Sequence, residues 1–357
     1  MKRTILTLTA VMILLSGCNK EDSQPVPVDT GYLYGAYIIN EGSFTHNNGS
    51  ISYLDLDSNY VVNNLFYTVN GRPLGDIVQS FSVAGDKGLI AVNNSAKVEV
   101  IDLKSFVSLG TITGCNYPRY TLPLDNDKVY LSNGSLAGQI YIIDLRSLAI
   151  VDSIPAGMGP EAMVRNGNYV FVANSGGWGH DSTVFVIDAY DDMIVDTVYT
   201  GDNPVDLALD RDGNVWVLCR GKVVYDQNWN VVEETDSRLQ KIDARKLEVV
   251  VDLVIGEKGD FFNPQRIAVA DEGSTILYAE KNGIYSVSTE HPETPTDPLI
   301  QGSFYGLDVD PKANVIYVTD ARDFSSAGIL YRYTREGNMI DSVLTGIAPN
   351  GVYFHEP

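Results

Sequence analysis

Side chains that could bind a ligand recur in short segments, each next to a run of β-branched and aromatic residues. The segments combine amides, both signs of charge, aromatic rings and glycine. They therefore offer hydrogen bonds, ion pairs and stacking rather than one reactive group, since an amide both donates and accepts. The residues that we predict to bind a ligand are Asn40, Glu41, Phe44, Asp76, Asn93, Asn94, Arg119, Asn133, Glu161, Asn174, Trp178, Arg220, Arg266, Glu280, Tyr305, Asp320 and Phe324.

The sequence contains no recognisable catalytic or metal-binding motif. It has neither a Gly-x-Ser-x-Gly segment nor a paired cysteine and histidine. Glu161 and Asp76 could form a carboxylate pair, but nothing sets their separation. The stretch Asp210-Arg-Asp-Gly213 is better explained as a turn than as a calcium loop, because the further ligands are missing. The histidines and cysteines show no zinc spacing. We therefore predict a binding protein that is not an enzyme and has no metal or cofactor.

The elements that position these segments repeat along the chain. In the clearest unit, residues 160–164, 168–174, 184–188 and 194–198 are short runs of strand-forming residues separated by turns. The third run ends in an apolar residue and an aspartate at Leu54-Asp55, Ile101-Asp102, Ile143-Asp144, Ile187-Asp188 and Ile242-Asp243, at intervals of 47, 42, 44 and 55 residues. A four-stranded unit of ~45 residues is typical of a propeller blade.

Seven such units can be counted, and the first lacks a strand that residues 350–354 could supply. We therefore predict an all-β, seven-bladed β-propeller over residues 35–357, closed by its C-terminal strand in the first blade. In a propeller the links between blades share one face with the loops that join the second and third strands. The predicted ligand-binding residues come from these two loop sets, whereas the opposite face holds generic turn residues such as Asp125-Asn-Asp127.

Each of these polar residues has a purely structural alternative. An asparagine at a strand end often caps a turn through the backbone. Arg119, Arg220 and Arg266 could equally pair with carboxylates of the blades. Trp178 points more clearly to a ligand, because a glycine-rich loop has no packing need for an indole.

The N-terminus has the layout of an exported protein. Lys2 and Arg3 precede an apolar run over residues 5–15, which is shorter than the about 20 residues that a bilayer-spanning helix needs. The next residues, Leu15-Ser-Gly-Cys18, are similar to the lipobox of bacterial lipoproteins. We predict a signal peptide over residues 1–17 and a lipid on Cys18, with an ordinary secreted protein as the alternative.

Residues 18–34 are predicted to be a lipidated cysteine followed by an extended linker. Within it, residues 19–23 resemble the surface-export signal of Bacteroidetes lipoproteins. We therefore expect an outer-membrane lipoprotein displayed on the cell surface, attached to the membrane through its lipid anchor alone.

Composition narrows the range of partners. A formal net charge of −21 opposes binding to nucleic acid, which needs a basic surface. It also opposes docking on anionic lipid head groups. Cys115 and Cys219 fall in different repeat units, so we predict buried free thiols rather than a disulfide.

The repeats resemble those of known propeller lipoproteins of gut Bacteroidetes with YVTN-type, YncE-like repeats, and in particular the corrinoid-capturing surface lipoproteins of BtuG type. The resemblance covers nearly the whole chain and rests on Asn40-Glu-Gly42, Gly75-Asp-Ile77, Val92-Asn-Asn-Ser95, Pro118-Arg119, Gly159-Pro-Glu161 and Phe171-Val-Ala-Asn-Ser-Gly176. It implies that one face binds vitamin B12 as a ligand and passes it to a TonB-dependent outer-membrane transporter of BtuB type. The Val-Ala-Asn-Ser form departs from the Tyr-Val-Thr-Asn repeat core.

Three functions remain open on the sequence, since the fold alone does not choose among them. The first is capture of a corrinoid or another bulky polar nutrient. The second is a lactonase or hydrolase type of propeller enzyme, which would need a metal or a base and nucleophile that the sequence does not reveal. The third is a module that binds a protein partner.

Overall fold

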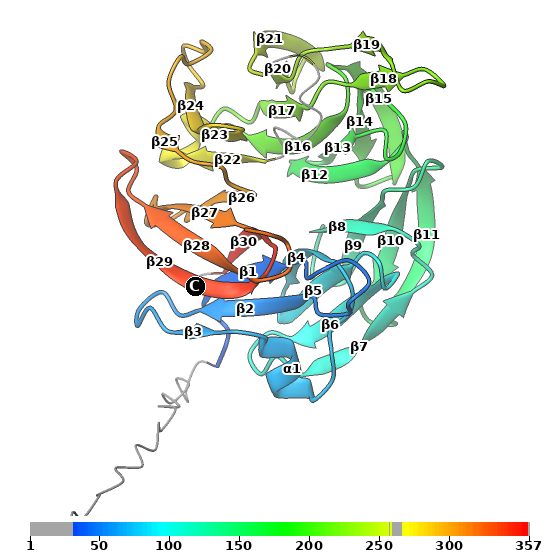
Figure 1. The fold of residues 1–357 in the computed structure, drawn as a ribbon. Helices are drawn as coiled ribbons and strands as arrows, with labels where there is room; N and C mark the ends of the chain where they lie inside the picture. Colours follow the sequence, from blue (N-terminus) through cyan, green and yellow to red (C-terminus); the bar gives the residue numbers. More distant parts are fainter. Residues whose placement is uncertain (1–30, 257, 259–265, 356–357) are drawn as a thin grey trace, which may run out of the picture.

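The computed structural model describes residues 31–256, 258 and 266–355, and the regular secondary structure of these residues is almost entirely β-strand. Seven four-stranded antiparallel sheets stand around a common axis (Figure 1). The innermost strands of neighbouring sheets contact one another around that axis. The predicted seven-bladed β-propeller is thereby confirmed.

Each blade runs from an innermost strand at the axis to an outermost strand at the rim, and its strands are named in that order. Blade 1 contains β30 (Pro349–His355), β1 (Gly35–Asn40), β2 (Ser50–Leu54) and β3 (Val61–Val62); blade 2 contains β4 (Val78–Ala84), β5 (Lys87–Val92), β6 (Lys97–Asp102) and β7 (Ser108–Thr113); blade 3 contains β8 (Pro118–Pro123), β9 (Lys128–Asn133), β10 (Gln139–Asp144) and β11 (Ala149–Pro155). Blade 4 contains β12 (Pro160–Asn166), β13 (Tyr169–Asn174), β14 (Thr183–Asp188) and β15 (Met193–Tyr199); blade 5 contains β16 (Pro204–Leu209), β17 (Val215–Cys219), β20 (Arg238–Asp243) and β21 (Glu248–Val254); blade 6 contains β22 (Ile267–Ala270), β23 (Thr275–Glu280), β24 (Gly283–Ser288) and β25 (Ile300–Gln301); blade 7 contains β26 (Gly306–Val309), β27 (Ile316–Asp320), β28 (Ala327–Tyr333) and β29 (Met339–Ile347).

The repeated aspartate that ends the third strand has a local structural cause. Its side chain accepts a hydrogen bond from a backbone N–H two or three residues further on, which fixes the turn into the fourth strand. The bond is 2.8 Å at Asp102, 3.1 Å at Asp144, 2.8 Å at Asp188 and 2.9 Å at Asp243. The aspartate therefore recurs in the sequence because the same turn recurs in each of these blades.

The C-terminal strand closes the ring as predicted. Strand β30 pairs antiparallel with β1, with Ile38 opposite Val352, and it contacts β4 of blade 2 and β26 of blade 7. One sheet is thus built from both ends of the propeller. Removing β30 would expose the backbone of β1 as an unpaired edge.

Buried apolar side chains lie between the blades. The described residues contain seven such clusters, and each joins two neighbouring blades. Between blades 3 and 4, for example, Tyr130 and Val172 belong to one cluster and are fully buried. A blade alone would leave these faces in water, so the ring is stabilised as a unit.

Two elements were not expected from the sequence. The helix α1 (Leu65–Asn70) buries Leu65 and Phe66, but six residues make less than two turns and show no helical period. Blade 5 carries an extra hairpin of β18 (Val223–Tyr225) and β19 (Val231–Glu234) between β17 and β20. This insertion accounts for the interval of 55 residues before Asp243.

Cys115 and Cys219 are buried free thiols, as predicted. Burial raises the pKa of Cys115 to about 11 and that of Cys219 to about 12, so both stay protonated at neutral pH.

The predicted signal peptide and Cys18 lie outside the described residues. Just before β1, Tyr32 packs edge-on against Tyr53 at 5.2 Å.

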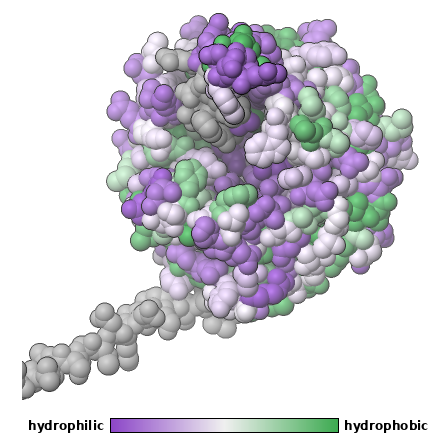
Figure 2. Space-filling model, turned by 45° about the vertical axis from the view of Figure 1, so that its right-hand side comes forward, coloured by the Kyte–Doolittle hydropathy of each residue, from purple (hydrophilic) through white to green (hydrophobic). Residues whose placement is uncertain are grey.

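In the described part of the chain, no helix has the length and apolar character needed to cross a bilayer. Hydrophilic residues cover most of the surface visible in Figure 2, with apolar residues in small groups between them.

Candidate ligand-binding site

A cavity of about 600 Å³ opens on the face where the links between blades meet the loops that join second and third strands. Residues from all seven blades line it, which places it on the propeller axis. We call this face the cavity face. The lining residues are Glu41, Phe44, Ile77, Gln79, Asn93, Asn94, Tyr117, Arg119, Tyr120, Gly134, Glu161, Ser175, Gly177, Trp178, Val205, Arg220, Arg266, Tyr305 and Asn350.

A repeated backbone hydrogen bond positions much of this wall. In five blades the first residue after the second strand donates its N–H to the carbonyl of the link that precedes the innermost strand. These bonds run from Glu41 to Ala348, from Asn93 to Ile77, from Gly134 to Tyr117, from Ser175 to Gly159 and from Arg220 to Asn203, with distances of 2.7–3.1 Å. Each donor residue lines the cavity, so the fold itself presents this position to a ligand.

The link residues also carry backbone strain. Ile77, Gly159, Asn203 and Ala348 all have a φ of 50° to 59°, in the left-handed region. Glycine and asparagine tolerate that conformation, whereas a β-branched residue there is an outlier. Ile77 is therefore a strained residue in the cavity wall.

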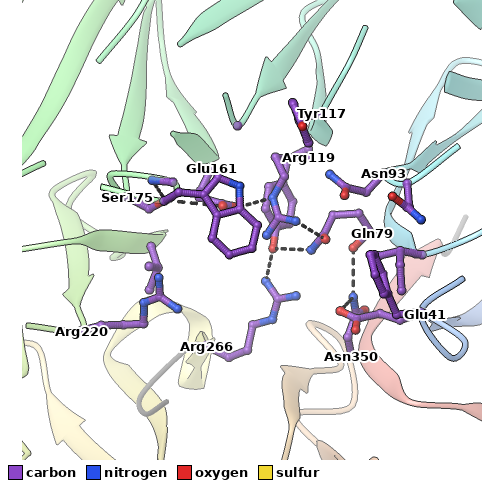
Figure 3. Close-up of a pocket in the computed structure, with 18 of the residues that line it drawn as sticks. Glu41, Gln79, Asn93, Tyr117, Arg119, Glu161, Ser175, Arg220, Arg266 and Asn350 are labelled. Carbon is purple, nitrogen blue, oxygen red and sulfur yellow. Dashed lines mark hydrogen bonds and ion pairs between the residues drawn. The ribbon is translucent and has the colours of Figure 1, made fainter. Parts of the chain in front are cut away.

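Arg119 joins three blades at one side of the cavity (Figure 3). Its Nε donates to Glu161 Oε2 at 2.7 Å, and its Nη1 donates to Gln79 Oε1 at 2.6 Å. Ser175 Oγ approaches the other Glu161 oxygen at 3.5 Å. Burial opposes the charge on Arg119, but the negative charge of Glu161 outweighs burial and raises the pKa of the guanidinium.

A second link crosses the axis. Arg266 Nη1 donates to the Tyr120 hydroxyl at 2.5 Å, joining blade 6 to blade 3 (Figure 3). Burial opposes the charge on Arg266, but Tyr120 and Asp206 outweigh it and raise the pKa of the guanidinium. Burial also raises the pKa of Tyr120, against the effect of Arg266, so the phenol stays protonated.

Two carboxyl groups on inner strands face Arg266. Burial raises the pKa of Asp206 to about 6 and that of Asp308 to about 7, although Arg266 lowers both. Each also accepts a backbone N–H from the next inner strand: Asp206 from Ile267 at 3.0 Å, and Asp308 from Val352 at 2.6 Å. They therefore join neighbouring blades while their charge changes near neutral pH.

Glu41 holds the other side of the cavity. Its Oε2 accepts the Tyr305 hydroxyl at 2.9 Å, and its Oε1 accepts the Asn350 amide at 2.8 Å. Burial, followed by the charge of Glu41, raises the pKa of Tyr305. Asn350 lies on the closing strand β30, so this part of the wall forms only when the ring is closed.

Exposed aromatic rings surround the opening. Trp178 is 89% exposed and Phe44 is 66% exposed, and both line the cavity. Phe324 is half exposed and packs edge-on against Tyr305, with ring centroids 5.1 Å apart. Rings left this open in a rigid loop are available to stack on a bound molecule.

Of the predicted residues, those that line the cavity are Glu41, Phe44, Asn93, Asn94, Arg119, Glu161, Trp178, Arg220, Arg266 and Tyr305. Asp76 is buried directly behind them and accepts the Asn94 amide at 2.5 Å, so it supports Asn94. Phe324 touches the wall through Tyr305.

The other predicted residues lie elsewhere. Asn40, Asn133 and Asn174 end second strands and are buried, with their amides bonded to Ser52, to the N–H of Tyr117 and to Thr183 respectively. The structure thus places these three behind the cavity wall, because their side chains are buried and the next residue in each case lines the cavity. Asp320 accepts the N–H of Arg322 at 2.7 Å in its own turn, and Glu280 borders a separate cavity beside Tyr285.

Sequence reasoning missed Gln79, Tyr120 and Asn350 as cavity residues. They lie on β4, β8 and β30, the inner strands, close to the point where each strand begins. A polar or amphipathic residue at that position is the signal that could have identified them.

Over the described parts of the chain, no group of three or more histidine, cysteine, aspartate or glutamate side chains could hold a metal ion. What the cavity offers is a set of amides, guanidinium groups, carboxylates and aromatic rings. That set can bind a polar molecule from several sides at once.

The fold and this cavity define a seven-bladed β-propeller with an axial pocket on one face. Residues 34–354 match the family described as a domain of unknown function, DUF5074, and the chain belongs to that family. No curated protein matches the sequence significantly. The propeller expected from the sequence resemblance is thus confirmed, and the corrinoid ligand stays a prediction.

Solved structures show the same architecture. A quinoprotein alcohol dehydrogenase-like protein of Bacteroides thetaiotaomicron is similar with a TM-score of 0.67 and 14% identity, over 92% of this chain and 80% of that one. The hydrazine synthase of Kuenenia stuttgartiensis is similar with a TM-score of 0.57 and 16% identity, over 79% of this chain and 92% of that one. A dihydro-heme d1 dehydrogenase, NirN, is similar with a TM-score of 0.57 and 12% identity, over 93% of this chain and 77% of that one. At such low identity the likeness shows the fold alone.

Proposed function

We propose that the chain captures a corrinoid in the axial cavity, acting as an outer-membrane lipoprotein, and passes the corrinoid to a TonB-dependent transporter. The observation that carries the proposal is the cavity itself: about 600 Å³, lined from all seven blades by amides, guanidinium groups and aromatic rings. That volume falls within the roughly 300–1,000 Å³ of small-molecule sites.

The chemistry of a corrinoid suits this lining. It is a flat macrocycle with amide side arms, and the amides of Gln79, Asn93 and Asn94 can both donate to and accept from such arms. A complete corrinoid with its side arms and nucleotide is larger than the cavity, so part of it would lie across the opening. There the exposed rings of Phe44 and Trp178 supply flat contact surfaces.

We propose binding rather than turnover because the ionisable groups of the wall are engaged with one another. Glu161 is paired with Arg119, and Glu41 accepts bonds from Tyr305 and Asn350. The raised pKa of Tyr120 opposes its use as a base. Ligand recovered unchanged after long incubation supports this part of the proposal, and a modified product contradicts it.

Calorimetric titration with cyanocobalamin tests the ligand. Single alanine variants of Arg119 and Arg266 should bind on the order of tenfold to a hundredfold more weakly, since charge-assisted bonds contribute roughly 1.5–3 kcal/mol each. Alanine variants of Trp178 and Tyr305 should also bind more weakly, because they remove aromatic surface that the ligand would bury. Asp127→Ala, on the opposite face, is the control and should bind like the parent. A parent that does not bind cyanocobalamin contradicts the corrinoid ligand; five variants that all bind like the parent contradict the site.

The membrane part of the proposal has its own test. Cys18→Ala should abolish labelling by a radioactive fatty acid and release the protein from the membrane fraction. Continued labelling of the variant would exclude Cys18 as the lipid attachment site.

A further inference from the structure

Three exposed apolar side chains lie on neighbouring loops of blades 3 and 4, beside the cavity. Trp178 is 89% exposed, Leu136 is 54% exposed and Met158 is 37% exposed. A Cβ atom at Gly179, in the loop that carries Trp178, would lie 3.6 Å from Leu136 Cδ2 and 3.8 Å from Met158 Sδ, which are ordinary contact distances. Leu136 and Met158 therefore pack beside this loop. We call Leu136, Met158 and Trp178 the apolar shelf.

Backbone hydrogen bonds hold the three loops of the shelf together. The N–H of Gly159 donates to the carbonyl of Ser135 at 3.0 Å, and the N–H of Gly176 donates to the carbonyl of Met158 at 2.8 Å. Asp181 Oδ2 accepts the N–H of Met158 at 2.8 Å. The exposed side chains thus stand on a backbone that is already ordered, so a molecule that binds them need not order the loops.

The shelf continues the surface of the cavity. Trp178 lines the cavity, as do Gly134 and Gly177 in the same loops, whereas Leu136 and Met158 lie just beyond the lining. A molecule that fills the cavity and extends over blades 3 and 4 would therefore pass from polar groups onto an apolar surface.

The edge of the opening differs from blade to blade. Blades 1 and 7 place the rings of Phe44 and Phe324 there. The described lining of blades 5 and 6 includes the guanidinium groups of Arg220 and Arg266. Blades 3 and 4 are the side where aliphatic and thioether groups extend the apolar surface beyond the cavity lining.

We infer that the apolar shelf binds the part of the ligand that extends beyond the cavity, and that this part is apolar. The inference rests on the proposed function and deepens it. A complete corrinoid is larger than the cavity, and its macrocycle carries methyl groups between its amide arms. The cavity takes amide arms, and the shelf takes a methyl-bearing edge of the macrocycle. Met158 suits this contact, because a flexible thioether adapts to an irregular apolar surface.

Two substitutions make the shelf polar without changing its bulk. Leu136→Asn and Met158→Gln replace apolar groups by amides of similar size and leave Trp178 in place. The matched controls are Leu109→Asn and Met193→Gln, since these residues are 49% and 62% exposed on the outermost strands β7 and β15. All four variants should melt like the parent, because the side chains are already in contact with water.

Calorimetric titration with cyanocobalamin at several temperatures tests the inference. Each shelf variant should bind about threefold to tenfold more weakly than the parent, and the double variant should lose more. The heat capacity change of binding should become less negative in the double variant, because burial of apolar surface makes it negative. The control variants should match the parent in both quantities.

An apolar dye tests the shelf without a corrinoid. The probe is 1-anilinonaphthalene-8-sulfonate, which fluoresces strongly when its rings leave water. It should fluoresce equally with the parent and with the double control variant, and more weakly with the double shelf variant.

The outcomes separate the shelf from the proposed function. Shelf variants that bind cyanocobalamin with the parent's affinity and heat capacity change overturn the shelf and leave corrinoid capture standing, as does an equal loss in the control variants. If the parent does not bind cyanocobalamin, corrinoid capture fails and the dye decides. Weaker fluorescence of the double shelf variant then supports the shelf as the apolar subsite of a different ligand, and equal fluorescence overturns it as well.

Discussion

The two faces of the propeller use polar side chains in different ways. On the face opposite the cavity, Asp125 Oδ1 accepts the N–H groups of Asp127 at 2.8 Å and Lys128 at 2.7 Å, within a single turn. Asp243 does the same for Arg245 at 2.9 Å. These residues shape the turn to which they belong and reach no further.

On the cavity face the partners belong to different blades. Arg119 contacts residues 40 and 42 positions away, Arg266 reaches Tyr120 across 146 positions, and Tyr305 reaches Glu41 across 264. On this face the polar residues bond between blades and converge on one cavity, which the formation of turns alone does not require. Bonds between blades also occur on the opposite face, where Lys128 Nζ contacts Asp192 Oδ1 at 2.6 Å. The convergence of such contacts on one cavity therefore distinguishes the cavity face.

Removal of the closing strand β30 should unfold the propeller and so disrupt both of its faces. Truncation after Ala348 deletes β30, leaves β1 without its inner partner and removes Asn350 from the cavity. We expect loss of cooperative unfolding, measured by circular dichroism during heating. A truncated chain with the parent's melting curve would show that the ring does not depend on this strand.

The inner strands beneath the cavity should make stability depend on pH. Asp308 has a raised pKa of about 7 in the folded protein, so the folded state binds more protons than the unfolded state between about pH 4 and 7. Stability from this group is therefore full below pH 4 and falls as the pH rises to 7.

Asp308→Asn should remove that loss, since an amide oxygen can still accept the N–H of Val352. Its free energy of unfolding relative to the parent should increase by on the order of 4 kcal/mol between pH 4 and 8. Urea unfolding at several pH values measures this difference. A constant difference across that range would mean that Asp308 ionises normally.

Blade 4 has one highly exposed aromatic residue on each face, so substitutions of the two test the difference between the faces. Trp178 is 89% exposed at the cavity, and Tyr190 is 83% exposed at the turn between β14 and β15. Trp178→Ala should weaken cyanocobalamin binding about tenfold, or about 1.4 kcal/mol, whereas Tyr190→Ala should leave it unchanged. Both variants should melt like the parent. Equal effects on binding would remove the distinction between the two faces.

Substitution of Ile77 tests whether the backbone of the cavity face is strained at a residue with a positive φ. Blades 4 and 5 place Gly159 and Asn203 at the equivalent position, where φ is positive. Ile77→Asn should therefore stabilise the protein by about 1 kcal/mol, because a β-branched residue is unfavourable there. Gly159→Ala is the reverse control and should destabilise it. Denaturant midpoints measure both, and a destabilised Ile77→Asn would show that side-chain packing outweighs the backbone.

The fold could be predicted from the sequence because its signals are local. The aspartate at the end of each third strand bonds within its own turn, so its period reports the blade directly. The closing strand was visible because residues 350–354 have the pattern of a blade's first strand. The helix α1 and the hairpin β18–β19 gave no comparable periodic signal.

The site was predicted less completely, since its geometry depends on contacts between blades. Loop residues such as Arg119 and Glu161 were recognised by type, but their pairing follows from the ring. Asn174 and its equivalents lie behind the cavity wall, and the burial of their side chains could not be read from the residue type. Tyr120 was missed because a tyrosine in a strand is usually part of the sheet's packing.

The closing strand has a consequence for how the protein is made. Strand β30 is the last part of the propeller to leave the ribosome, and its partner β1 is the first, so no ring can form until β30 has been synthesised. Contacts of such long sequence separation form slowly, and the open edges are exposed until they do. Because Asn350 bonds to Glu41 in the cavity, a truncated or unfinished chain also lacks a complete binding site. Ligand binding would thus report that the ring has been closed by β30.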